Sequence, residues 1–215
     1  MDKKTKIQIV LQRLAKVISV PETELHFEDP FQLLVSVVLS AQCTDKRVNL
    51  VTPALFEAFP TIDAMAETTF DDLFPFIKSI SYPNSKTQHL LETAKILKET
   101  HGSSIPRDYD ELLKLPGVGR KTANVLNSVL YREPRMAVDT HVFRVSNRLG
   151  IAEGKTVLEI EKQLTKNIPE NQIPDAHHYL ILHGRYTCVA RNPKCKICVL
   201  TDICEDFTTK NPPNS

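Results

Sequence analysis

The chain has 215 residues, of which 41% are hydrophobic and 25% charged, so it is long enough to bury a core and ordinary for a globular protein. Its formal net charge of +1 neither requires nor excludes a nucleic-acid partner, and any such partner must be inferred from local charge. The sequence has no apolar run of about 18 residues that could cross a membrane. We therefore expect a cytoplasmic protein in a reducing compartment.

Helical periodicity dominates from the first residues, where apolar side chains over 7–18 recur at spacings of three and four. Further helices are predicted over 31–42, 51–59, 70–77 and 85–102, the last with Ser85 as its cap and Gly102 at its end. The sequence has no alternating strand pattern. The predicted fold class is all-α.

The helices fall into two predicted lobes. Residues 23–133 form one helical lobe, and residues 134–215, with three more helices, form a second. The N-terminal helix could pack on either lobe, and we group residues 1–22 with the second. Residues 208–215, which end in a polar, proline-containing segment, are predicted to be disordered.

Basic residues gather in two stretches of the otherwise balanced chain. Residues 114–148 contain seven Lys or Arg and two acids, and residues 184–196 contain four basic residues and no acid. A solvated basic helix face explains either stretch alone. Together they favour one DNA-facing side.

Two helical patterns, 112–115 and 121–131, are joined by a Pro-Gly-Val-Gly segment, which predicts a helix-hairpin-helix motif. Gly117 and Gly119 permit positive φ and close approach, so the N–H groups over 117–119, including that of Val118, could bind a phosphate. A tight interhelical turn is the alternative. Arg120 and Lys121 lie in the first turn of the second helix, where the dipole disfavours cations, and a bound phosphate would compensate.

A further helix follows Pro134, with Asp139 at its N-cap position and Gly150 at its end. From the residues alone, capping explains Asp139 better than catalysis does. Lys121, taken alone, is likewise better explained as a phosphate contact.

Four of the five cysteines, Cys188, Cys195, Cys198 and Cys204, lie close together in the pattern C-x6-C-x2-C-x5-C. In a reducing compartment such a group indicates a metal site rather than disulfides. Spacing alone leaves both Zn²⁺ and an iron–sulfur cluster open. Cys43 stands apart and is predicted to be a small buried hydrophobe without a function.

The segments LPGVGRKTANV, AVDTHVFRVSNRLG and HHYLILHGRYTC, together with the cysteine pattern, resemble the endonuclease III family of DNA glycosylases with lyase activity. The resemblance covers residues 5–206. It implies base-excision repair of oxidised pyrimidines, with a DNA-binding active site in the cleft between the two helical lobes. It also implies that the four cysteines hold a structural [4Fe-4S] cluster.

The resemblance further implies that Lys121 is the nucleophile and Asp139, 18 residues later, its catalytic carboxylate. The damaged nucleotide is flipped out of the duplex, and the lysine displaces the base at C1′. The resulting Schiff base is resolved by β-elimination, which cuts the strand on the 3′ side. No metal or nucleotide cofactor takes part in this chemistry.

Further DNA contacts follow from the same resemblance. Gln42 matches a glutamine that fills the gap left by the flipped base, and Tyr82 matches a residue that wedges between bases. Here Tyr82 and Pro83 replace the leucine and tyrosine usual in the family, so a core role for Tyr82 stays open. Arg191 and Lys194, between the first two cysteines, are expected to bind phosphates; a solvated loop is the alternative.

Two rival functions remain. An enzyme that removes adenine from mismatches shares the hairpin and cysteines but usually lacks a lysine at the position of Lys121 and carries a long C-terminal domain. A non-enzymatic DNA-binding module would bind without cutting and would leave Lys121 and Asp139 unexplained. The expected partner is double-stranded DNA with damaged bases or abasic sites. We expect a monomer without membrane contact, associated with the nucleoid if the source is bacterial.

Overall fold

The computed structural model describes residues 1–211, and all regular secondary structure in that range is helical, which confirms the predicted all-α class. The chain divides into two compact units: unit 1 is Met1–Glu22 with Arg132–Ser215, and unit 2 is Thr23–Tyr131. Among the described residues, no helix combines the length and apolar character that a membrane span requires.

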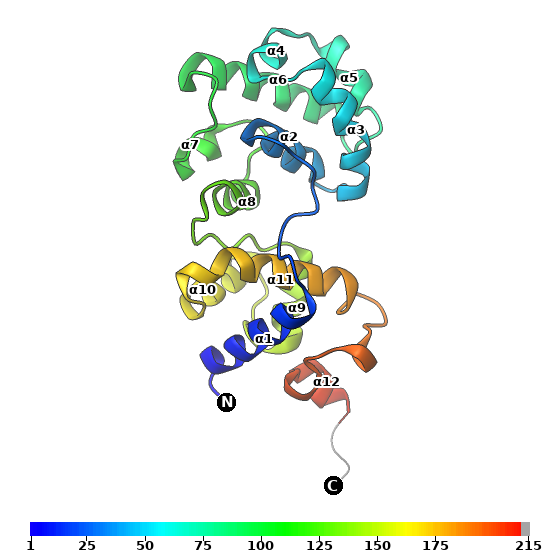
Figure 1. Cartoon of the computed structure of the whole chain (residues 1–215), viewed down its shortest axis with the longest axis vertical. Coiled ribbons are helices and arrows are strands. Elements are labelled where there is room, and N and C mark those ends of the chain that lie inside the picture. The colour runs from blue at the N-terminus through cyan, green and yellow to red at the C-terminus, as the bar shows by residue number, and fades with distance from the viewer. Residues whose placement is uncertain (212–215) are drawn as a thin grey trace. The chain divides into compact units, whose positions relative to one another are not determined.

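Unit 2 is built around a hydrophobic central helix, α2, whose residues from Phe31 to Leu39 are almost all buried. Asp29 caps α2 and Pro30 occupies its first turn. Helices α3, α6 and α8 pack around α2 (Figure 1). The helices of the unit are α2 (Pro30–Ser40), α3 (Asp45–Ala58), α4 (Ile62–Glu67), α5 (Phe70–Ile77), α6 (Pro83–His101), α7 (Tyr109–Lys114) and α8 (Arg120–Tyr131).

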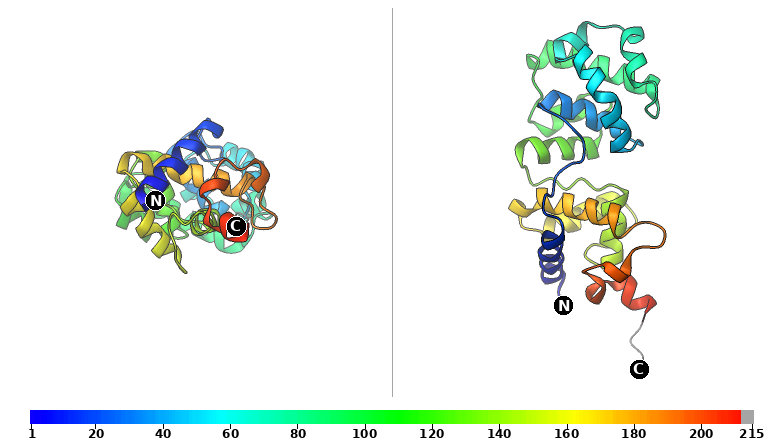
Figure 2. Two further views of the ribbon diagram at one scale, coloured as in Figure 1. Left: turned by 90° about the horizontal axis from the view of Figure 1, so that it is seen from below. Right: turned by 45° about the vertical axis from the view of Figure 1, so that its right-hand side comes forward.

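Unit 1 has its own hydrophobic core, to which the N-terminal helix contributes Ile7, Val10 and Leu14. That helix packs against α10 and α11, as the right-hand view of Figure 2 shows. The elements of the unit are α1 (Lys3–Val17), α9 (Thr140–Leu149), α10 (Val157–Asn167), α11 (Ile173–Tyr186) and α12 (Glu205–Lys210), with 3₁₀ turns η1 (Glu170–Gln172), η2 (Cys195–Ile197) and η3 (Thr201–Ile203).

The two units meet in the sequence at Tyr131, two residues before the predicted boundary at 133. Helix α8 ends at Tyr131, and Arg132 adopts a left-handed conformation with φ of 55°. The Arg132 guanidinium donates to Asp175 Oδ1 at 2.7 Å, a residue of unit 1. Arg132 therefore belongs to unit 1 by its contacts, which the helical pattern alone does not reveal.

The C-terminal segment differs from the prediction of disorder over 208–215. Helix α12 continues to Lys210, with Thr208 N donating to Cys204 O at 3.0 Å and Asn211 N to Phe207 O at 2.9 Å. The ammonium of Lys210 also pairs with Asp206 one turn earlier, at 2.8 Å. Residues 212–215, the rest of the predicted disordered segment, lie outside the described residues.

Two helix assignments in unit 2 also differ. Helix α3 begins at Asp45 rather than at 51, because the Thr44 side chain caps it by accepting from Arg47 N at 3.2 Å. Its first turns are polar and carry little apolar periodicity. Helix α4, with only six residues, was not predicted, although Thr61 provides its cap.

Candidate functional site

The predicted helix-hairpin-helix is present as α7, a turn over 115–119, and α8. Thr93 of α6 fixes the turn by donating from its hydroxyl to Pro116 O at 2.9 Å. Gly117 has φ of 77°, and a Cβ there would lie 3.1 Å from His89 Nδ1, so the turn requires glycine at this position. A Cβ at Gly119 would meet no atom within 4 Å, so this glycine faces open space.

Val118 does not fit the predicted DNA contact. Its side chain is buried, and its N–H donates to Leu115 O at 3.0 Å within the turn. The apolar side chain is drawn into the core of unit 2 because the turn reverses there. Val118 therefore shapes the hairpin and offers DNA no unused donor.

Arg120 and Lys121 are the first two residues of α8, and both are exposed. The first N–H groups of a helix have no partner within it and carry the positive end of the dipole. The first turn of α8 contains no acid. Unit 2 thus exposes two cations and the amides of a helix start, an arrangement suited to an anionic backbone.

Asp139 lies in unit 1 and caps α9. Its Oδ1 accepts from His141 N and from Val142 N, both at 2.8 Å. The cap favoured from the residues alone is therefore present. Both bonds use Oδ1, and Oδ2 is not part of the cap.

Gln42 and Tyr82, the predicted inserting residues, share an unusual backbone. Gln42 has φ of 53° and Tyr82 φ of 55°, in the left-handed region that non-glycine residues rarely adopt. Gln42 is exposed, and the Tyr82 side chain is 64% exposed. The alternative that Tyr82 belongs to the core is wrong. Sparse conformations at exposed polar and aromatic residues are typical of functional turns.

The four clustered cysteines line one pocket of unit 1 together with Arg148 and His183. Four cysteines around one pocket can hold either a tetrahedral Zn²⁺ or an iron–sulfur cluster.

The surroundings of the sulfur atoms also suit a buried cluster. Cys188, Cys198 and Cys204 pack against the hydrophobic core of unit 1. Burial raises the pKa of the Cys198 and Cys204 thiols, so iron binding has to displace their protons. An all-thiolate donor set suits soft metal centres, and iron–sulfur clusters are among them.

Two arginines of α9 hold the cysteine loop, a role that the sequence analysis missed. Arg148 donates to Cys188 Sγ at 3.4 Å, to Val189 O at 2.8 Å and to Ala190 O at 2.9 Å. One turn earlier, Arg144 donates to Cys188 O at 3.1 Å and to Gly184 O at 2.8 Å. Both were counted in the basic stretch assigned to DNA. In the sequence, the spacing of four residues between Arg144 and Arg148 indicates only that both lie on the same face of the helix.

Arg191 and Lys194 remain exposed in the loop between Cys188 and Cys195. The backbone there is fixed, since Lys194 N donates to Thr187 O at 2.9 Å and Asn192 turns the chain with φ of 52°. An ordered loop therefore presents both cations to solvent.

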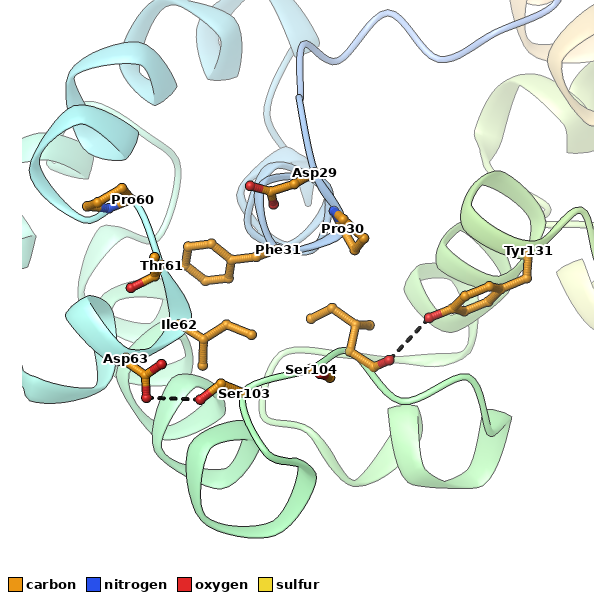
Figure 3. A pocket seen from close by; sticks show the side chains of 11 residues that line it. Asp29, Pro30, Phe31, Pro60, Thr61, Ile62, Asp63, Ser103, Ser104 and Tyr131 are labelled. Carbon is orange, nitrogen blue, oxygen red and sulfur yellow. Dashed lines mark hydrogen bonds between the residues drawn. The ribbon is translucent and has the colours of Figure 1, made fainter.

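A separate hollow of unit 2 lies at the start of α2 (Figure 3). Gln42 follows the end of that helix. Asp29 and Phe31 line the hollow from the start of α2, and Tyr131 lines it from the end of α8. The Tyr131 hydroxyl donates to Ile105 O at 3.1 Å across its edge. None of the predicted site residues lines this hollow.

Comparison with known proteins identifies the family to which the chain belongs. A model of the HhH-GPD superfamily of base-excision DNA repair proteins matches residues 35–170. The iron–sulfur binding domain of endonuclease III matches residues 188–204, which begin and end with clustered cysteines.

Curated relatives match over most of their length. Endonuclease III of Rickettsia felis is 50% identical over 189 residues, which are 88% of this chain and 89% of the relative. Endonuclease III of Escherichia coli strain K12 is 46% identical over 205 residues, which are 95% and 97% of the two chains.

Solved structures agree with the fold. A trapped endonuclease III–DNA covalent intermediate is similar at a TM-score of 0.92 and 43% identity, covering 98% of this chain and 99% of the other. A thermostable thymine-DNA glycosylase matches at 0.83 and 20% identity, covering 95% and 98%, which supports the fold alone.

The helix-hairpin-helix and the match over residues 35–170 make this chain a base-excision DNA repair protein of the HhH-GPD superfamily. Within that superfamily, the chain belongs to the endonuclease III family of DNA glycosylases with AP lyase activity. Its cofactor is a [4Fe-4S] cluster, as the matched iron–sulfur domain and the endonuclease III relatives indicate.

Proposed function

We propose that this chain excises oxidised pyrimidines from double-stranded DNA and cuts the strand 3′ of the abasic site by β-elimination, with Lys121 as nucleophile. The observation that carries the proposal is the position of Lys121, an exposed amine in the first turn of α8 directly after the glycine hairpin. A related endonuclease III has been trapped as a covalent intermediate with DNA. A lysine beside a phosphate-binding hairpin is suited to such an intermediate.

The chemistry needs a flipped nucleotide, because C1′ is inaccessible within the stacked duplex. The neutral Lys121 amine attacks C1′, and the bond between C1′ and the base breaks, so the base leaves with the bonding electron pair. Asp139 accepts the lysine proton and stabilises positive charge on the sugar, as carboxylates do in glycoside hydrolysis. Its Oδ2, which the cap of α9 does not use, is the atom for this task.

Ring opening converts the amine adduct to an iminium ion. The iminium withdraws electrons from C2′, so a C2′ proton is removed and the C3′–oxygen bond breaks. The 3′ phosphodiester is cut, and water then releases Lys121 from the sugar. Apart from this water, the reactants are groups of this chain and the DNA.

The residues proposed to contact DNA have different tasks. Gly117, Gly119 and Arg120 bind phosphates at the start of α8 without reading sequence. Gln42 fills the space of the flipped base, and Tyr82 stacks in the helix.

Arg191 and Lys194 add phosphate contacts from the cluster loop, so the cluster has a structural and electrostatic role. The four ligands are Cys188, Cys195, Cys198 and Cys204. When bound, the cluster holds the loop in a fixed shape.

The partner is duplex DNA with an oxidised base or an abasic site, and the protein acts as a monomer. Chromosomal DNA as substrate favours the cytoplasm, with nucleoid association if the source is bacterial.

A product analysis tests this function. A duplex with one thymine glycol, labelled at its 5′ end, should yield free base and a cut strand with an unsaturated aldehyde at its 3′ end. An undamaged duplex should stay intact. Tight binding without base release or cutting would instead identify a non-enzymatic DNA-binding module.

A further inference from the structure

Lys86 of α6 is a buried lysine with unusual partners. Its side chain is only 5% exposed, and its ammonium donates to Leu39 O at 2.8 Å and to Ala41 O at 2.6 Å. Buried ammonium groups are normally paired with carboxylates, since desolvation of a charge is costly. Here the acceptors are main-chain carbonyls at the C-terminal end of α2, where the helix dipole is negative.

The same residue is bonded to the second inserting turn. Lys86 N donates to Tyr82 O at 3.1 Å, while its ammonium holds Ala41, the residue directly before Gln42. Lys86 therefore connects the carbonyl that precedes Gln42 with the carbonyl of Tyr82, the first through its side chain and the second through the main-chain bond that begins α6. A weaker contact runs parallel, with Arg47 Nε donating to Ser79 O at 3.4 Å.

These hydrogen bonds join two segments whose backbone conformations are unfavourable. Left-handed conformations at non-glycine residues such as Gln42 and Tyr82 are unfavourable and persist only where the surroundings fix them. Burial lowers the pKa of Lys86, and the neighbouring Cys43 opposes that effect. The ammonium is thus desolvated between the two turns, where its bonds to carbonyls are strengthened.

We propose that Lys86 is a positioning residue that fixes Gln42 and Tyr82 relative to each other, so that both side chains enter the duplex together. The proposal rests on the proposed function, because it gives Gln42 and Tyr82 their task. Lys86 acts through these two residues and not on the reacting atoms. Its effect should therefore be confined to substrates in which a paired base must be replaced.

The first test compares Lys86→Met with Lys95→Met in the holoenzyme. Lys95 is an exposed lysine of the same helix, so its variant removes the same charge without touching either turn. We expect Lys86→Met to slow single-turnover base release from a thymine glycol duplex by about 10- to 100-fold, the effect of a misplaced side chain. Lys95→Met should match the parent.

A single-stranded abasic oligonucleotide separates positioning from loss of fold. It leaves no opposite base and no gap to fill, so Lys86→Met should cut it within about twofold of the parent. An equal loss on both substrates would overturn the proposal, because it would indicate general damage. If the methionine variant does not fold, Lys86→Gln, which keeps a shorter donor, should give the same pattern with a smaller loss.

A double-mutant cycle tests the route through Gln42. In a Gln42→Ala background, Lys86→Met should lose little further duplex activity, since the residue it positions is already absent. Full additivity of the two losses would contradict a role through Gln42.

Hydrogen exchange without DNA keeps this inference distinct from the proposed function. Backbone amides of residues 41–44 should exchange faster in Lys86→Met than in Lys95→Met. Unchanged exchange would overturn the positioning role even in an active enzyme. If the parent does not act on thymine glycol while exchange responds as expected, the fault lies with the assigned substrate, and the connection between the turns stands.

Discussion

The carboxylate of Asp139 combines a structural and a proposed chemical task. Its Oδ1 caps α9 with two hydrogen bonds of 2.8 Å, and the proposed mechanism uses its negative charge. Asn caps helices about as well as Asp, but it carries no charge. The two tasks can therefore be separated by substitution.

We predict that Asp139→Asn keeps the thermal midpoint of the parent and slows base release by about 100-fold or more. Asp139→Ala should also lose about 1 kcal/mol of unfolding free energy, because the cap is gone. Single-turnover kinetics and thermal denaturation measure both effects. A parental rate for Asp139→Asn would leave the residue with the cap alone.

His178 of α11 makes unit 1 sensitive to acid. Burial lowers its pKa to about 4, with Asp175 opposing and Arg132 and Arg185 adding to the shift. The His177 ring also lies against it, with centroids 4.9 Å apart. A histidine whose pKa is lowered on folding binds its proton more readily in the unfolded chain. The stability it contributes is full above pH 6.5 and is lost as pH falls towards 4.

We predict that the parent loses about 1 kcal/mol more unfolding free energy than His178→Gln between about pH 7 and about pH 5.5. Urea titrations followed by helical circular dichroism at both pH values measure this difference. The comparison cancels other acid-sensitive groups, including the cluster. Equal losses in the two proteins would exclude His178 as the source.

At the scale of elements, the hairpin assigns different tasks to its two glycines. Gly117 is required by its φ of 77° and by His89, whereas Gly119 faces open space. We predict that Gly117→Ala lowers the unfolding free energy by about 1 kcal/mol or more, because alanine is strained there. Gly119→Ala should keep the stability and weaken binding to an abasic-analogue duplex, since its Cβ would stand where a phosphate approaches.

Denaturation and DNA titrations of both glycine variants distinguish these effects. Parental DNA affinity in Gly119→Ala would remove the hairpin from the phosphate-binding surface.

The cysteine loop should depend on α9 as well as on its ligands. Arg148 donates to Cys188 Sγ and to two loop carbonyls. We predict that Arg148→Gln loses its cluster faster than the parent when diluted into an iron chelator, because three acceptors lose their donor. The visible absorbance of the cluster reports the rate. Arg132→Gln, which removes an ion pair of unit 1 outside the loop, is the matched control; equal rates in both variants would contradict the role of Arg148.

The elements that the sequence predicted well are those with a strong local signal. The apolar pattern of α2 and the Pro-Gly-Val-Gly turn are readable because each is decided by adjacent residues. The start of α3 depends on a threonine cap and carries little apolar periodicity, so it was misplaced, and α4 was missed because it has only six residues. Helix α12 was missed because it has only six residues, most of them polar, and carries little apolar periodicity.

At the scale of the molecule, the candidate site could be predicted only in its residue types. The sequence shows the cysteine spacing and the presence of Lys121 and Asp139. Their roles were predicted from the resemblance to the family. Arg148 and Lys86 bond to main-chain carbonyls distant in sequence, and no side-chain pattern marks such acceptors. The burial of the Val118 side chain was not predictable, because an apolar residue in a turn can point either way until the core is known.

The proposed reaction depends on a covalent bond between Lys121 and the sugar. Borohydride reduces a Schiff base to a stable amine, so the protein should be trapped on a thymine glycol duplex and on an abasic duplex alike. We predict that Lys121→Gln abolishes both complexes while DNA binding persists. Lys114→Gln, which removes an exposed lysine at the end of α7, should be trapped as the parent is. Undiminished trapping of Lys121→Gln would contradict the central claim.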